Sequence, residues 1–122
     1  MNTPDRRPRA LRRAEAATAA WRETVEHQQD ATPRHADFYA LAGEVVATLY
    51  ALDDLTVVLA AQVGRYGEGR GLYDDTRTVD PADRLAEAVD SLRKVHTALG
   101  VVTPVVHGFW NAIGHIGVEA GP

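Results

Sequence analysis

Residues 32–66 read TPRHADFYALAGEVVATLYALDDLTVVLAAQVGRY, and this stretch decides the fold. Apolar residues recur in it at steps of three and four, the spacing that places side chains on one side of an α-helix. Thr32-Pro33 is typical of a helix start, and the glycines from Gly64 to Gly71 indicate the end. The sequence therefore predicts one helix over 32–66, about 50 Å long. The side chains of this predicted seam are Phe38, Leu41, Val45, Leu49, Leu52, Leu55, Leu59, Val63 and Tyr66.

The back of this helix is also apolar. At about 100° per residue, Val46, Tyr50, Val57 and Val58 fall well away from the predicted seam. A surface helix of a soluble protein normally carries charges on that side. Either the helix is central in a bundle, or its back is an interface. We expect these four residues to contact a second copy of the chain, forming a homo-oligomer, with a dimer favoured, or to contact a helix of another protein.

The length and composition of the chain are typical of a single soluble domain. The chain has 122 residues, 25% of them charged and 45% apolar. It has no cysteine, which excludes disulfides, thiol catalysis and cysteine-held metals. No apolar core follows the first arginines, as a secretory signal would require, and no apolar run is long enough to span a bilayer. We expect a cytoplasmic protein that neither enters a membrane nor carries a cofactor.

Two further helices complete the expected fold. A narrow apolar stripe around Trp21 predicts a helix over about 9–31, and Asp80-Pro81 opens another that extends to about 117. Pro104 either kinks this last helix or ends it and starts a fourth. The fold class is therefore all-α, an antiparallel bundle of three long helices, possibly four. Residues 1–8 form a flexible basic lead-in, 9–117 a single bundle domain and 118–122 a disordered tail.

Basic residues gather near the N-terminus. Residues 1–13 contain five arginines and one aspartate, a balance of +4. Because the net charge of the whole chain is −4, the rest of the chain carries −8. In the expected bundle this arm lies beside the glycine-rich loop, and both could bind phosphates. No aromatic residue interleaves the arginines and no DNA-reading motif is present, so acidic contacts within the chain or on a partner are at least as compatible. The residues concerned are Arg6, Arg7, Arg9, Arg12, Arg13, Arg65 and Arg70.

Ionisable residues offer weaker signals. No histidine pair has the spacing of a helical zinc motif, so a metal-dependent enzyme is the third and least favoured hypothesis. His96 lies among the apolar positions of the last helix and is expected to be a hydrogen-bonded core residue. Asp53 lies at the flank of the predicted seam, where either an arginine of another helix or solvent would balance its charge.

The segments that follow the long helix carry no recognisable chemistry. Residues 64–80 are too irregular for a helix or strand, and their glycines indicate mobility rather than a phosphate-binding loop. In the last helix, Trp110 is expected either to pack in the core or to anchor an interface. Its indole N–H, like the amide of Asn111, should need a hydrogen-bond partner.

The segment FWNAIGHIGVE, residues 109–119, follows DPADRLAEAVDSLRKVHTAL, residues 80–99. Together they resemble small helical proteins of actinobacteria, some of them carried on mobile elements. The resemblance covers about the second half of the chain and implies no activity. The leading hypothesis is therefore a non-enzymatic helical interaction protein, and the alternative is a nucleic-acid accessory protein.

Overall fold

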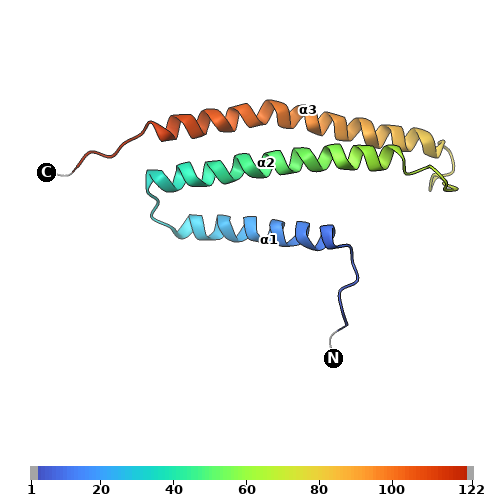
Figure 1. Cartoon of the computed structure of the whole chain (residues 1–122), viewed down its shortest axis with the longest axis horizontal. Helices are drawn as coiled ribbons and strands as arrows, with labels where there is room; N and C mark the ends of the chain where they lie inside the picture. Colours follow the sequence, from blue (N-terminus) through green and yellow to red (C-terminus); the bar gives the residue numbers. More distant parts are fainter. Residues whose placement is uncertain (1–2, 121–122) are drawn as a thin grey trace. The chain divides into compact units, whose positions relative to one another are not determined.

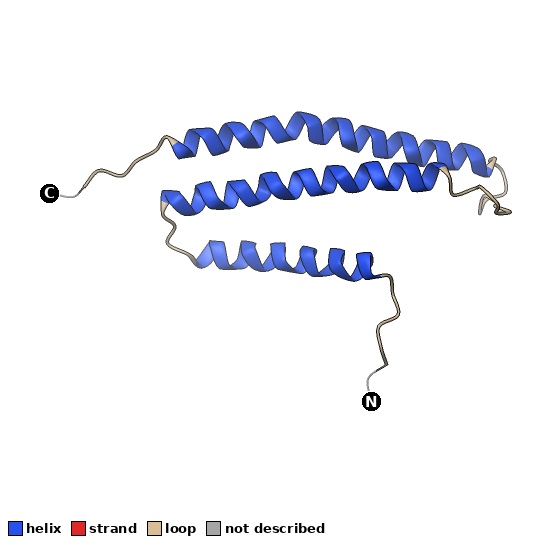
Figure 2. Ribbon diagram, viewed as in Figure 1, coloured by secondary structure: helices blue, strands red, loops and turns tan. Residues whose placement is uncertain are grey.

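The computed structural model describes residues 3–120. Three α-helices make up its regular structure, and no strand occurs in that range (Figure 2). By its internal contacts the chain divides into two units, Met1–Arg34 and His35–Pro122, and each is described by itself below. The all-helical class and the three long helices predicted from the sequence are confirmed.

The first unit contains α1, Arg9–Asp30, close to the predicted range. Pro8 precedes the helix without a capping hydrogen bond from its side chain, and Ala31 ends it in an extended conformation. The composition explains the helix, because alanine, glutamate and arginine have high helix propensities. Residues 3–8, the predicted lead-in, have no helix or strand, while residues 1 and 2 lie outside the described part.

The second unit begins with α2, His35–Gly64. The predicted start at Thr32-Pro33 is wrong by three residues, because both residues belong to the connection after α1. Proline disfavours the helical conformation of the residue before it. Asp37 in the first turn instead supplies the negative charge that stabilises a helix N-terminus. Beyond Gly64 the backbone continues in hydrogen-bonded turns rather than in helix.

The last helix, α3, extends over Pro81–Gly114. Its start is as predicted, since the Asp80 carboxylate accepts a hydrogen bond of 2.9 Å from the backbone N–H of Ala82. The helix is continuous through Pro104, so the possible fourth helix is absent from the described residues. It ends before the predicted residue 117, and no regular structure follows up to Ala120. Residues 121 and 122 of the predicted tail lie outside the described part.

Within the second unit, α2 and α3 pack side by side (Figure 1). They are antiparallel, because Gly43 near the start of α2 meets Trp110 near the end of α3, and Gly64 at the end of α2 meets Val89 in the first half of α3. We refer to this pair as the hairpin. No described helix is long and apolar enough to cross a membrane.

The small core of the hairpin corrects the predicted orientation of α2. Ala42 and Val46, each 4% exposed, are the buried apolar residues of the described chain. Val46 was expected on the back of the helix, available to a partner, and that expectation is wrong. It lies on the same side of α2 as Gly43 and Tyr50, both of which contact α3. Residues of the predicted seam are exposed instead, namely Leu52, Leu55 and Leu59.

Candidate functional site

An aromatic cluster joins the two helices near the end of α3. The Trp110 ring packs over Gly43, where an added Cβ atom would lie 3.4 Å from Cζ2 of the indole. Tyr39 approaches the same ring, with 5.3 Å between centroids, and His107 stacks on it at 5.7 Å. The Tyr50 hydroxyl lies 3.2 Å from Nε2 of His107. Trp110 therefore packs within the hairpin, as the core interpretation of this residue requires.

The indole N–H of Trp110 does not have the hydrogen-bond partner that the sequence analysis expected. The nitrogen is buried and has no hydrogen-bond partner within the described chain. A buried donor without a partner lowers stability relative to a paired one. The packing of the ring over Gly43 thus fixes the position of the tryptophan without help from its polar atom.

A second contact across the hairpin lies between Asp53 and His96. The Nδ1 atom of His96 is 2.5 Å from a carboxylate oxygen of Asp53. Of the two predicted alternatives for Asp53, an arginine of another helix or solvent, the arginine is wrong, because a histidine occupies that place. His96 forms the expected hydrogen bond, but its side chain is 55% exposed rather than in the core. The hydroxyl of the buried Thr56 donates a hydrogen bond to the Asp53 carbonyl.

A shallow groove between α2 and α3 lies beside these contacts. It encloses about 450 Å³ and is lined by Tyr50, Asp53, His107 and Asn111 among other residues, with Pro104 on its α3 side. Tyr50 and His107, which both line the groove, interact with each other. Asp53, which also lines it, interacts with His96. These hydrogen bonds join α2 to α3. No group of metal-ligating side chains with suitable geometry occurs among the described residues.

The loop between the helices is organised around Asp74. This residue is 7% exposed, and its carboxylate accepts a hydrogen bond from the hydroxyl and another from the backbone N–H of Thr76. The guanidinium of Arg84, in the first turns of α3, donates to it at 2.8 Å. Two further arginines lie over tyrosine rings, Arg77 over Tyr73 and Arg70 over Tyr66. Sequence reasoning predicted a mobile loop and missed this anchor, which depends on an arginine ten residues away.

The Asp74 contacts predict a specific sensitivity to acid. The hydrogen bond from Thr76, followed by that from Arg84, holds the pKa of the Asp74 carboxyl well below its usual range. An unfolded aspartate has a pKa of about 3.9. Below about pH 4 the unfolded chain therefore binds a proton that the folded chain does not, so folding stability falls as the pH decreases. We expect Asp74→Asn to lose less stability than the wild type between pH 5 and pH 3, measured by urea unfolding.

The control for this experiment is Asp75→Asn, at the exposed neighbouring position. Its loss of stability over the same pH range should match that of the wild type. If Asp74→Asn and the wild type lost equal stability on acidification, the Asp74 carboxylate would not be the group that responds.

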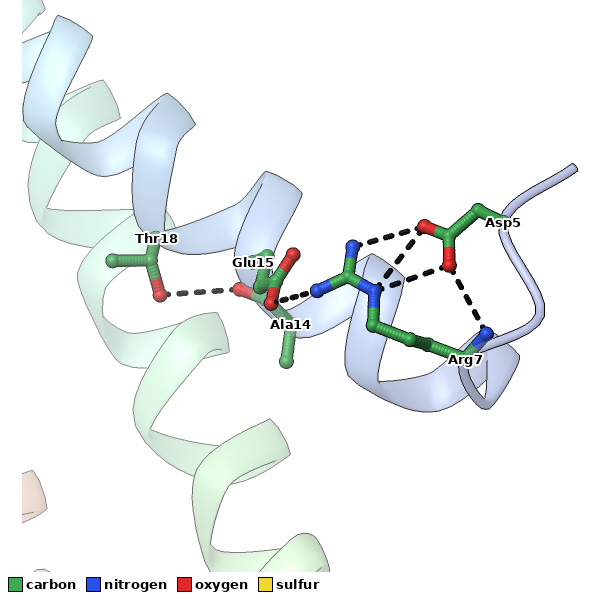
Figure 3. Close-up of polar contacts among 5 residues, drawn as sticks. All are labelled: Asp5, Arg7, Ala14, Glu15 and Thr18. Atoms are coloured by element: carbon green, nitrogen blue, oxygen red, sulfur yellow. Dashed lines mark hydrogen bonds and ion pairs between the residues drawn. The ribbon is translucent and has the colours of Figure 1, made fainter. Parts of the chain in front are cut away.

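The arginine arm is partly occupied by acids of its own unit. Arg7 contacts Asp5 at 2.9 Å and Glu15 at 2.6 Å (Figure 3). The hydrogen bond from the Arg7 side chain lowers the pKa of Asp5. Exposed ion pairs of this kind add little to stability, but they keep part of the arm folded back on α1. Their presence agrees with the expected contacts to acids within the chain.

The remaining arginines of the arm are exposed. Arg6 precedes α1, and Arg9, Arg12 and Arg13 lie in its first two turns, the first of which contains no acidic residue. In the loop, Arg65 is exposed, and Arg70 donates a hydrogen bond of 3.0 Å to the Tyr66 carbonyl. Contact of these residues with nucleic acid stays a prediction, as does the proximity of the arm to the loop.

The predicted interface residues do not lie on one face. Tyr50, Val57 and Val58 are 53%, 55% and 50% exposed. Tyr50 lines the groove, and helical spacing places Val57 close to the α3 side of α2. Val58 points away from α3, together with exposed leucines that sequence reasoning had assigned to the packed side. We call this the outer face of α2, and its residues are Leu52, Leu55, Val58 and Leu59.

Comparisons with known proteins identified no relative of this chain. No protein-family model, no curated protein and no solved structure matched the chain. The function is therefore argued from the surface and contacts of the chain itself.

Proposed function

We propose that this protein is a non-enzymatic helical association protein that self-associates through the outer face of α2. The observation that carries the proposal is the exposure of Leu52, Leu55, Val58 and Leu59, which are 47%, 47%, 50% and 36% exposed on one side of a continuous helix. Apolar patches of this kind on soluble proteins mark sites of protein contact.

The scarcity of buried apolar residues supports the same function. No side chain in the described part of the chain is completely buried, and α2 contributes both members of the apolar core, Ala42 and Val46. A hairpin of two long helices needs more apolar burial than this to offset the conformational entropy lost on folding. Each large aliphatic side chain that another helix covers adds about 1.5–3 kcal/mol. Association would supply the burial that the hairpin lacks.

The outer face is also free of charge along its central part. Glu44 and Arg65 lie at either end of that side of α2, and Asp54 lies at its edge, one helical turn before Val58. Asp53 points toward α3, where it contacts His96, and Asp54 is rotated about 100° from Leu55. A second copy that contacts Leu52, Leu55 and Leu59 therefore buries no charge. Burial of an unpaired charge would oppose association.

Leu55→Asp tests the proposal directly. Leu55 lies opposite the α3 side of the helix, so the substitution leaves the hairpin contacts intact. We expect a smaller assembly than for the wild type in sedimentation velocity at micromolar concentrations. The dissociation constant of the α2 contact should rise about tenfold or more, because the burial of one leucine is lost and a charge is placed in the contact.

Thr97→Asp is the matched control, since this exposed residue lies on α3 rather than on the outer face of α2. It should sediment like the wild type. Helical circular dichroism spectra of all three proteins should agree. A wild-type protein that stays monomeric at every concentration, or a Leu55→Asp assembly of unchanged mass, would refute self-association through this face.

A further inference from the structure

A second exposed apolar surface lies on α3, separate from the outer face of α2. Its side chains recur in strict steps of three and four, and each of them is exposed, Val105 at 70% and Phe109 at 51%. This spacing forms a straight stripe along a helix and is the repeat by which helices pair in coiled coils. The stripe consists of Val95, Ala98, Val102, Val105, Phe109 and Ala112.

The charge distribution of α3 changes where this stripe begins. The helix carries six charged residues from Asp83 to Lys94, and then none from Val95 to its end at Gly114. When the same spacing is continued toward the start of α3, it passes through Ser91, Ala88 and Arg84, two of which are polar. The exposed side of a soluble helix normally carries charges. The uncharged half of α3 thus coincides with the α3 stripe.

The order of large and small residues identifies the occupant. When two copies of the stripe are placed antiparallel with a two-fold axis between Val102 and Val105, all six positions find partners. Val95 meets Ala112 of the second copy, Ala98 meets Phe109, and Val102 meets Val105. Large side chains face small ones in the outer layers, the arrangement by which helix layers interdigitate. The stripe is therefore complementary to itself under the symmetry of a dimer.

Parallel pairing would fit poorly. It would place Phe109 against Phe109 of the second copy, and it would leave layers in which Ala98 meets Ala98 and Ala112 meets Ala112. Crowded and empty layers would then alternate, and both overpacking and cavities destabilise. Antiparallel helices also oppose their macrodipoles favourably. Pro104 does not interfere, because it lies off the stripe and lines the groove facing α2.

We propose that the α3 stripe binds the same stripe of a second copy of this chain, antiparallel, with the two-fold axis between Val102 and Val105. This contact is independent of the outer face of α2. With both contacts in place the wild-type protein forms an assembly larger than a dimer, and each contact alone holds a dimer. The two proposals can therefore fail separately.

Sedimentation velocity of four variants at about 1–100 μM separates these outcomes. Val105→Asp changes a position of the stripe that is 70% exposed, and Thr97→Asp places the same charge at an exposed position off the stripe. We expect Val105→Asp to be a dimer, Thr97→Asp to match the wild type, Leu55→Asp to be a dimer held by α3, and the Leu55→Asp/Val105→Asp protein to be a monomer. A tenfold or greater rise in the dissociation constant of the α3 contact is expected for Val105→Asp.

Each of the other outcomes contradicts at least one of the two proposals. If Leu55→Asp alone were monomeric, the α3 contact would be overturned while self-association through α2 would stand. If Val105→Asp alone were monomeric, the α3 contact would stand and the α2 contact would fail. A monomeric wild type would overturn both. Circular dichroism spectra that match the wild type show that each variant is still helical.

Spin labels measure the orientation of the α3 pair. Because the chain has no cysteine, Lys94→Cys and Asn111→Cys each provide a single labelling site. The measurement uses the Leu55→Asp protein, in which only the α3 contact remains. In the antiparallel pair the two labels at position 94 are about 30 Å apart along the helices, at 1.5 Å per residue. A mixed sample labelled at 94 and 111 should show a distance below about 20 Å. Short distances between two labels at position 94 would show parallel pairing and overturn the proposed arrangement.

Discussion

Val46→Asp is expected to unfold the hairpin. Val46 is 4% exposed, on the side of α2 that meets α3, so the aspartate would have to enter the contact without a partner or force the helices apart. The loss in the free energy of unfolding should be about 4 kcal/mol or more, at the upper end of single substitutions. Far-UV circular dichroism during thermal unfolding would measure it as a large drop in the midpoint or as lost helix at room temperature.

Leu55→Asp is the contrast to Val46→Asp, because both place an aspartate on α2 at positions nine residues apart. The variant at position 55 should remain folded and only sediment differently, since its leucine is 47% exposed. If Val46→Asp were as stable and helical as Leu55→Asp, α2 would not be oriented with Val46 toward α3.

Trp110→Ala is expected to lower the free energy of unfolding by about 3 kcal/mol. The substitution removes the ring that fills the space over Gly43 and contacts Tyr39 and His107. The surrounding helices cannot close the space without moving, so a cavity remains. Urea unfolding followed by circular dichroism, at a fixed protein concentration, measures the loss.

Trp110→Phe provides the control for this loss. It keeps an aromatic ring between the helices and removes the indole N–H, which has no hydrogen-bond partner among the described residues. Its loss of stability should therefore be smaller than that of Trp110→Ala. A loss below about 1 kcal/mol for Trp110→Ala would show that the ring is not part of the packing between α2 and α3.

Local signals in the sequence were enough to predict the helices. The period of three and four residues identified α2, and Asp80-Pro81 located the start of α3, where the aspartate caps the helix. The prediction at Thr32-Pro33 failed because the same residue pair is compatible with an extended connection. Whether α3 continues through Pro104 could not be read from the chain, since a proline is tolerated where packing holds the helix on both sides.

The candidate site was less predictable, because it depends on which side of each helix meets the other. α2 is apolar around most of its circumference, so its pattern is compatible with several rotations about the helix axis. The choice is made by contacts with distant residues, such as Gly43 with Trp110 and Asp53 with His96. No spacing within α2 contains that information. The anchor of the loop, Asp74 with Arg84, was missed for the same reason.

The sequence by itself determined the helical class, the number and approximate bounds of the helices, and the absence of cysteine chemistry, because these follow from composition and from spacing along one segment. Only the tertiary structure decided that Val46 is buried while Leu55 is exposed, and that Asp53 contacts a histidine of α3. The physical reason is that burial is a property of two surfaces in contact. A helix with apolar residues on most sides can pack by any of them until a partner side chain, here Trp110 over Gly43, selects one.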